Sequence, residues 1–222
     1  MGADLPIRDA ATIILVRDIG LTPRILMGQR GKSAAFMPEK YVFPGGAVDR
    51  SDGDLPFARP LEPVCQDRLN WASEDVSAEA LAGAAIRELW EETGQCLGSQ
   101  GVWRDPPKGW RGFAEKGLLP DAGALNFFFR AITPPGRPRR FDARFFLADA
   151  AALATDPDDF GEAEDELAQL HWVGLDVALS RDLPFITRVV LAELARHLPR
   201  LDAPVGVPFV RNDRIDADVI WL

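Results

Sequence analysis

The hydrophobic positions along the chain form two patterns: continuous apolar runs, and apolar residues spaced three and four apart. Residues 11–16 (ATIILV) are an unbroken apolar run rich in β-branched side chains. Such a run is typical of a strand that is buried on both faces. Similar runs predict further strands at residues 24–30, 41–43, 124–132, 143–148, 169–173, 207–210 and 219–221. The sequence therefore predicts a sheet of several strands with a buried centre.

Helices are predicted between these strands. The clearest one ends at Thr93, before Gly94, and either Asp75 or Ser77 can cap its start. Its apolar residues follow a helical spacing: Leu81, Ala82, Ala85, Ile86, Leu89 and Trp90. Further helical segments are predicted at residues 184–198 and, in short form, near 65–69, 112–116 and 176–180. Interleaved strands and helices favour an α/β or α+β fold, with helices packed on a mixed sheet.

The length of the chain, 222 residues, is larger than that of a typical single domain. We expect one domain spanning residues 1–222 that carries an insertion. The insertion is placed at residues 49–75, where Asp, Pro and Arg are frequent and the hydrophobic period is lost. The hydrophobic share of 47% is enough to fill a sizeable core.

The charge balance limits the classes of partner. Acidic residues outnumber basic ones, 34 to 25, and the formal charge is −9. A surface of this sign repels phosphate backbones, which argues against general binding of nucleic acid or anionic membranes. No apolar run reaches the ~18 residues needed to span a bilayer, and the N-terminus lacks the pattern of a signal peptide. We therefore expect a cytoplasmic protein without such partners, and we leave open whether it forms a homodimer.

The cysteines and histidines do not indicate a disulfide framework or a zinc site. Cys65 and Cys96 are too few for a disulfide framework and are expected to be reduced thiols. His171 and His197 lie far apart and have no cysteine at zinc-ligand spacing. Any metal chemistry must therefore come from carboxylates.

Three glutamates near the end of the long predicted helix suggest such chemistry. At about 100° per residue, Glu88, Glu91 and Glu92 fall within an arc of roughly 100°. Like charges at these spacings each cost a few tenths of a kcal/mol, and the helix dipole is negative at this end. A bound cation would compensate for both costs. The alternative interpretation is a solvated, charged helix face.

The residue types around these glutamates suit a hard divalent ion. Mg²⁺ and Mn²⁺ prefer oxygen ligands and keep some water for a substrate phosphate. The nearby glycine-rich segment can supply a backbone carbonyl. Arg87 lies four residues before Glu91 and two helical turns after Glu79, and could hold both carboxylates by paired hydrogen bonds.

The spacing of these residues resembles the Nudix box, G-x5-E-x7-R-E-U-x-E-E-x-G-U, in which U is a bulky aliphatic residue. Glu79 is followed after seven residues by the segment 87–94 (RELWEETG), and the segment 43–46 (FPGG) resembles the usual opening of the box. The chain departs from the pattern in two places. There are 32 residues between Gly46 and Glu79 instead of five, and Gln95 stands at the last aliphatic position.

The resemblance implies a Nudix-type α/β/α sandwich on a mixed sheet. It implies that Glu88, Glu91, Glu92 and the carbonyl of Gly45 hold divalent metals, Mg²⁺ or Mn²⁺. It also implies that two further residues, Arg87 and Glu79, orient the metal ligands. We expect the inserted segment 49–75 to lie beside the metals, near the substrate cleft, and to influence substrate preference.

The implied reaction is hydrolysis of a nucleoside diphosphate linked to another group. A metal can neutralise the diphosphate and activate a water molecule, and a carboxylate can then accept the proton of that water. The catalytic candidates are Glu91 and Glu92 in the box, and Glu164 and Glu166 in the acidic loop 156–166. For the general base we consider Glu164, Glu166 and, as the alternative, Glu92.

The substrate is less clearly indicated than the reaction. Arg139 and Arg140 belong to the strongest basic run of an acidic chain, and they could bind a substrate phosphate; the alternative is a solvated turn. Together with the interrupted box, they weakly resemble the branch of coenzyme A diphosphatases, whose substrate carries an additional phosphate. ADP-ribose, a nucleotide sugar and a non-catalytic nucleotide-binding regulator are the alternatives.

Overall fold

The computed structural model describes residues 5–32, 37–73, 75–213 and 218–222. Within these residues nine strands form one mixed sheet, in the order β11-β10-β7-β8-β1-β2-β3, with β4 paired to β1 and β9 paired to β2. The strands are β1 (Ile7–Arg17), β2 (Arg24–Arg30), β3 (Tyr41–Val42), β4 (Gly45–Ala47), β7 (Asn126–Ile132), β8 (Arg140–Asp149), β9 (Leu167–Gly174), β10 (Pro208–Arg211) and β11 (Asp218–Trp221). β1 runs parallel to β8, and β10 runs parallel to β7; the other pairs are antiparallel.

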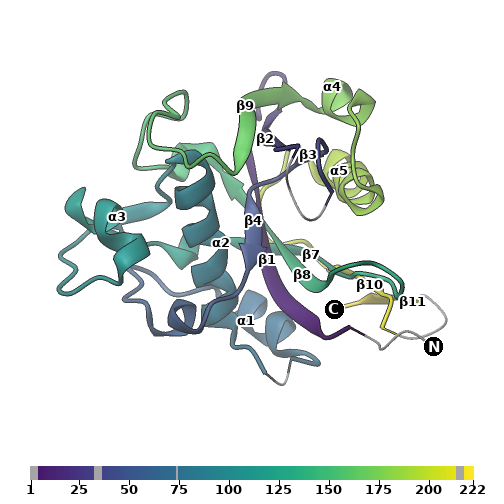
Figure 1. Ribbon diagram of the computed structural model, residues 1–222, viewed down its shortest axis with the longest axis horizontal. Helices are drawn as coiled ribbons and strands as arrows, with labels where there is room; N and C mark the ends of the chain where they lie inside the picture. The colour runs from purple at the N-terminus through teal and green to yellow at the C-terminus, as the bar shows by residue number, and fades with distance from the viewer. Residues whose placement is uncertain (1–4, 33–36, 74, 214–217) are drawn as a thin grey trace.

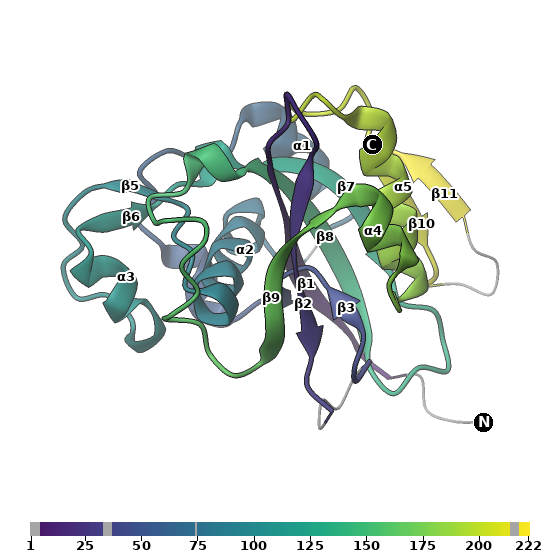
Figure 2. The same cartoon turned by 90° about the horizontal axis from the view of Figure 1, so that it is seen from above.

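Helices cover both faces of this sheet, which confirms the predicted α/β/α arrangement (Figures 1 and 2). The helices are α1 (Pro63–Asn70), α2 (Ala78–Thr93), α3 (Arg111–Glu115), α4 (Leu175–Ser180) and α5 (Phe185–His197). The alternation of side chains along β1 divides the core. Ile13 and Leu15 pack on the side of α2, whereas Ile14 and Val16 pack on the side of α5.

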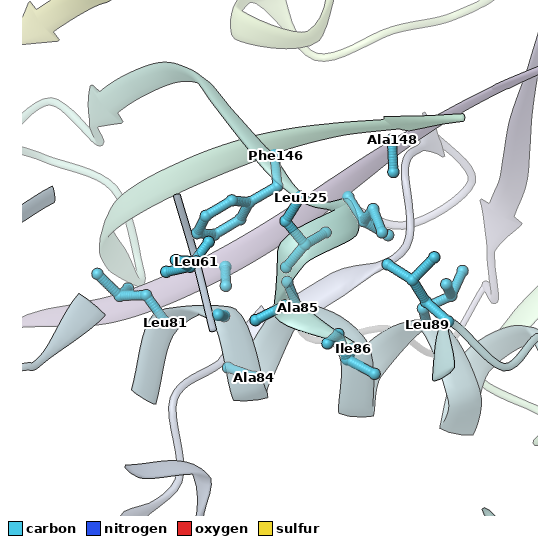
Figure 3. Close-up of a cluster of buried hydrophobic side chains, with 14 of the residues drawn as sticks. Leu61, Leu81, Ala84, Ala85, Ile86, Leu89, Leu125, Phe146 and Ala148 are labelled. Carbon is cyan, nitrogen blue, oxygen red and sulfur yellow. The ribbon is translucent and has the colours of Figure 1, made fainter. Parts of the chain in front are cut away.

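The ends of α2 agree with the prediction from the sequence. Ser77 is the N-cap, and its hydroxyl accepts a hydrogen bond from the amide of Ala80. Gly94 ends the helix in the left-handed conformation, at φ 72°. Figure 3 shows Leu81, Ala85 and Leu89 of α2 pointing toward the sheet, in one cluster with Phe146 and Ala148. This packing fixes the face of α2 that carries the glutamates.

The apolar side chains of the segment 49–75 pack into the core, and none of its described residues lines the cavity of the site, although Asp52 contacts Arg87 beside it. Its buried side chains, Leu55, Leu61, Cys65 and Leu69, belong to the same cluster as the apolar face of α2. It contains the 3-10 helix η1 (Arg50–Asp54) and the helix α1. The segment packs there because its apolar side chains are buried against α2 and not exposed to solvent. Glu74 lies outside the described residues.

Two further elements differ from the prediction. The segment Pro44–Gly46 was expected to be an irregular loop, but β4 pairs with β1, with Gly46 opposite Ala11. Glycine allows this close approach, since an ideal Cβ at Gly45 would lie 2.6 Å from the carbonyl oxygen of Ala11. In the mixed region 98–123, β5 (Gly98–Gln100) and β6 (Leu118–Pro120) form a two-stranded ribbon; strands this short give little periodic signal.

The structure also bears on the expected cysteine and membrane properties. Cys65 and Cys96 are both buried, and neither forms a disulfide bond. None of the helices in the described parts of the chain is long and apolar enough to cross a membrane.

Candidate active site

The site is built where the last turns of α2 meet β4. Glu92 is only 2% exposed, and its Oε2 accepts a hydrogen bond of 2.8 Å from the amide of Gly45. Its Oε1 is buried and has no hydrogen-bond partner among the described residues. The carboxylate of Glu88 lies directly against Gly46, where an ideal Cβ would be 2.3 Å from Glu88 Oε1. The absence of a side chain at Gly46 therefore makes room for the carboxylate of Glu88.

Arg87 organises the neighbouring charges, and all five of its N–H donors are used. Nη1 donates to Glu88 Oε1 at 2.8 Å and to Glu91 Oε2 at 2.9 Å. Nε and Nη2 donate to the two carboxylate oxygens of Asp52, and Nη2 also donates to the carbonyl of Ala47. This fork binds three carboxylates and a backbone oxygen with the geometry that only arginine provides.

The partner of Arg87 differs from the predicted one. Arg87 was expected to hold Glu79 as well as Glu91, but Glu79 lies exposed in the first turn of α2. Asp52, in the segment 49–75, occupies that role instead and is fully buried. Because the donors of Arg87 are already satisfied, none is left for Glu79.

The three box glutamates lie near one another, but they do not converge on one point. Glu91 and Glu88 both turn toward Arg87, while Glu92 turns toward the amide of Gly45. Among the described residues, no group of three or more acidic, cysteine or histidine side chains is arranged to hold a metal ion. The amide of Gly45, and not its carbonyl, is the group seen in contact with Glu92. The attraction of Arg87 accounts for this arrangement.

The electrostatics of the cluster show a shortage of positive charge. Burial raises the pKa of Glu88 to about 7, although Arg87 opposes the shift. Burial also raises the pKa of Glu91, again against Arg87. For Glu92 burial and then the charge of Glu88 raise the pKa well above its ordinary value, with the Gly45 amide opposing. Buried carboxyls that repel one another are stabilised when a cation is bound.

Of the two loop glutamates, one lies at the site. Glu166 lines the same cavity as Glu88, and its Oε1 accepts a hydrogen bond of 2.7 Å from Arg30 Nη2. Its charge acts on the carboxyls of both Glu88 and Glu92. Glu164 is exposed and does not line this cavity; its backbone amide bonds to the carbonyl of Glu91. Glu166 is thus better placed than Glu164 to act on a ligand.

The cavity has a volume of about 300 Å³ and lies on the α5 side of the sheet. Its floor is formed by side chains that alternate along two parallel strands: Arg8, Ala10 and Thr12 on β1, and Phe141, Ala143 and Phe145 on β8. One end is formed by Gly45, Gly46 and Glu88. Arg8 lies four residues from Thr12, which is opposite Gly45, so the basic end is ~13 Å from the glycine end.

The two arginines of the basic run have different environments. Arg139 lines the cavity together with Arg8. Arg140 is 2% exposed, and its guanidinium donates to the backbone carbonyls of Thr133 and Asn212. Arg140 therefore ties the β7–β8 connection to the segment after β10, and its expected contact with substrate is not supported. The difference follows from their positions, since Arg140 is the first residue of β8 and Arg139 lies in the turn before that strand.

Several functional candidates were missed from the sequence. Arg8 and Arg30 line the cavity, but isolated arginines in strands give no pattern. The buried Nε of Arg30 has no hydrogen-bond partner within the described ranges, so it is a donor available at the carboxylate end. In the sequence, only the position of Arg8 and Arg30 in or beside predicted strands pointed to them.

The donor set of the site fits a hard divalent cation. Glu92 Oε1 is a buried oxygen without a partner in the described part of the chain, and such an atom normally carries a cost of about 1–3 kcal/mol. The neighbouring oxygens of Glu88 and Glu91 are of the type that Mg²⁺ and Mn²⁺ prefer. The residues present are therefore compatible with the metal that the box implies.

Comparison with known proteins identifies the family. The sequence profile of the NUDIX domain matches residues 6–194. The chain belongs to the Nudix family. It is similar to the crystal structure of a NUDIX hydrolase from Alicyclobacillus acidocaldarius, with a TM-score of 0.66 and 28% identity, over 90% of this chain and 98% of that one.

Among curated proteins, the chain is similar to the acyl-coenzyme A diphosphatase NUDT19. The identity is 26% with the Gallus gallus protein, over 71% of this chain and 55% of that protein. It is 27% with the Homo sapiens protein, over 56% of this chain and 47% of that protein. The chain spans about half the length of the curated relatives it matches. The names of these similar proteins are those of a putative Nudix hydrolase, an acyl-coenzyme A diphosphatase and a NUDIX hydrolase.

Proposed function

We propose that this chain is a divalent-metal-dependent pyrophosphohydrolase that cleaves a nucleoside diphosphate linked to another group. The observation that carries the proposal is the buried Oε1 of Glu92, which has no hydrogen-bond partner among the residues described and lies near Glu88, a residue that lines the end of a cavity. Glu88, Glu91, Glu92 and the Gly45 carbonyl would hold Mg²⁺ or Mn²⁺. When bound, the metal neutralises the diphosphate and lowers the pKa of an attacking water.

The protein groups around this centre have separate roles. Arg87 holds Glu88 and Glu91 through one guanidinium nitrogen. The amide of Gly45 fixes Oε2 of Glu92 and leaves Oε1 for a ligand. Arg30 lines the cavity and can donate to a phosphate oxygen through Nε, which has no partner among the residues that the structure describes. These contacts position the reacting groups before the chemical step.

We assign the general base to Glu166. It lines the cavity that Glu88 enters, whereas Glu164 does not. Its ion pair with Arg30 holds the carboxylate at the cavity wall, and from there it can accept the proton of a water molecule. Glu92 is the weaker candidate, because its Oε2 is engaged by Gly45 and its Oε1 is better suited to a metal.

For the substrate we propose coenzyme A or its acyl esters. The cavity runs from the carboxylates to Arg8 and Arg139, which can bind a second anionic group ~13 Å away along β1. Coenzyme A has such a group, the phosphate on its ribose. The names of the two NUDT19 relatives support this choice. ADP-ribose and nucleotide sugars are the alternatives, since they contain the diphosphate without the additional phosphate.

A non-catalytic role as a nucleotide-binding regulator is less well supported. Glu88, Glu91 and Glu92, the three proposed metal ligands, are all present, and Glu92 is buried. We also propose that residues 1–222 form a single domain, because the segment 49–75 shares the core of α2 instead of forming a separate unit.

A hydrolysis screen tests the proposed function. The protein is incubated with coenzyme A, acyl-coenzyme A, ADP-ribose, dinucleotides and nucleotide sugars, with Mg²⁺, Mn²⁺ or EDTA, and products are identified by mass. We expect two phosphorylated products from coenzyme A in the presence of metal, and none with EDTA. Faster cleavage of ADP-ribose than of coenzyme A would change the proposed substrate to ADP-ribose and leave the proposed reaction unchanged. Nucleotide binding without any cleavage would favour the regulator.

A further inference from the structure

The segment 49–75 reaches the active site through one buried side chain. Asp52 is 0% exposed, and its two carboxylate oxygens accept hydrogen bonds from Arg87 Nε at 2.9 Å and Nη2 at 3.1 Å. Asp52 Oδ2 also accepts a hydrogen bond from the amide of Asp49, at the start of η1. The carboxylate is therefore held from both sides, by the 3-10 helix and by α2.

The backbone of η1 is fixed against α2 as well. Gly83 lies inside α2, where glycine costs about 1 kcal/mol relative to alanine. An ideal Cβ at Gly83 would lie 2.3 Å from the carbonyl oxygen of Asp52. The glycine therefore allows η1 to sit directly on the helix, one turn before Arg87.

The remaining donors of Arg87 connect this contact to the metal-binding glutamates. Nη1 holds Glu88 and Glu91, while Nε and Nη2 are directed to Asp52. A planar guanidinium cannot turn one edge without turning the other. The orientation of Nη1 toward the glutamates therefore depends on the pair with Asp52.

We propose that Asp52 is the positioning residue of this site: it orients Arg87 and, through it, Glu88 and Glu91. The resemblance to the box implies that Glu79 orients the metal ligands together with Arg87, but Glu79 is exposed at the first turn of α2. The insertion that interrupts the box thus supplies the carboxylate that the box no longer uses. This inference rests on the proposed metal-dependent function.

Two variants of the full chain test the inference. Asp52→Asn keeps the shape of the side chain and removes its charge, and Glu79→Gln makes the same change at the exposed position. Three quantities are measured: the dissociation constant of Mn²⁺ by electron paramagnetic resonance, the melting temperature, and kcat and KM at several Mn²⁺ concentrations.

We expect Asp52→Asn to raise the Mn²⁺ dissociation constant at least tenfold. Its kcat should fall at low Mn²⁺ and recover at high Mn²⁺, with KM for the organic substrate nearly unchanged. A purely structural role would lower the melting temperature without changing the Mn²⁺ affinity of the folded protein. Glu79→Gln should stay within twofold of the unmodified protein in every measurement.

The opposite outcomes overturn the inference. Unchanged Mn²⁺ affinity in folded Asp52→Asn refutes it, and so does weakened affinity in Glu79→Gln. If Asp52→Asn does not fold, Glu79→Gln decides, because unchanged Mn²⁺ affinity there supports the inference and weakened affinity refutes it. If the unmodified protein neither binds Mn²⁺ nor shows metal-dependent hydrolysis, the proposed function itself fails and the inference falls with it.

Discussion

Replacing Gly46 with alanine would place a methyl group against the carboxylate of Glu88. An ideal Cβ at Gly46 lies 2.3 Å from Glu88 Oε1 and 2.6 Å from Oε2, compared with ~3.5 Å for ordinary contact between heavy atoms. The carboxylate must therefore move by roughly 1 Å, and a displacement of this size at a catalytic site costs about 10²-fold in rate. We expect kcat of Gly46→Ala to fall about 100-fold.

The fold should tolerate this change. The obstructing atoms are the end of a flexible side chain, and the backbone of Gly46 is outside the left-handed region. Alanine also reduces the conformational entropy of the unfolded chain, so the free energy of unfolding should change by less than about 1 kcal/mol.

Gly45→Ala is a contrasting variant, because the same methyl group meets the backbone there, next to an amide that binds Glu92. Its ideal Cβ lies 2.6 Å from the carbonyl oxygen of Ala11 and 2.7 Å from the Cα of Thr12. Strand β1 cannot yield easily, so this variant should lose about 1–3 kcal/mol of unfolding free energy. Denaturant unfolding and kcat with saturating Mn²⁺ separate the two effects. The reasoning fails if Gly46→Ala keeps the kcat and metal dependence of the unmodified protein.

Three further predictions follow from the same geometry. Glu92→Gln should reduce kcat at least ~10²-fold while the protein remains folded; near-normal turnover would remove Glu92 from the site. Arg139→Ala should raise KM for coenzyme A about tenfold but not for dephospho-coenzyme A. Arg140→Ala should lower the melting temperature and leave KM unchanged, and the reverse pattern would exchange the roles of the two arginines. Without metal, the protein should become less stable as the pH rises from 4.5 to 7, because the pKa of Glu88 is raised from 4.5 to about 7 on folding, which is worth about 3 kcal/mol. Constant metal-free stability over that range, measured by denaturant unfolding, would contradict the burial of this carboxyl.

Local signals in the sequence were sufficient for the main elements. The helix α2 has a hydroxyl cap at Ser77 and a glycine stop at Gly94, and both operate as expected. The run 11–16 is the buried centre of β1. These features depend on residues close together in the chain, and such signals can be read without knowing the tertiary contacts.

The features that were missed depend on contacts between distant segments. Asp52 is one aspartate in a segment rich in charge, and only the packing of η1 on α2 brings it to Arg87. The strand β4 was not predicted because glycine usually indicates a loop. Here Gly45 and Gly46 instead allow the close approach of β1 and of Glu88. Arg140 was grouped with Arg139, although Arg140 is buried at the start of β8 and Arg139 lines the cavity from the turn before it.

Cleavage of coenzyme A in ¹⁸O-labelled water, followed by mass spectrometry, is the most direct test of metal-dependent diphosphate hydrolysis. With Mg²⁺ or Mn²⁺, we expect two phosphorylated products, one of which carries a single ¹⁸O atom from the attacking water. EDTA should abolish both products, and Glu92→Gln should reduce them at least ~10²-fold. Equal cleavage in EDTA, or no cleavage of any diphosphate in the screen with either metal, would contradict the account.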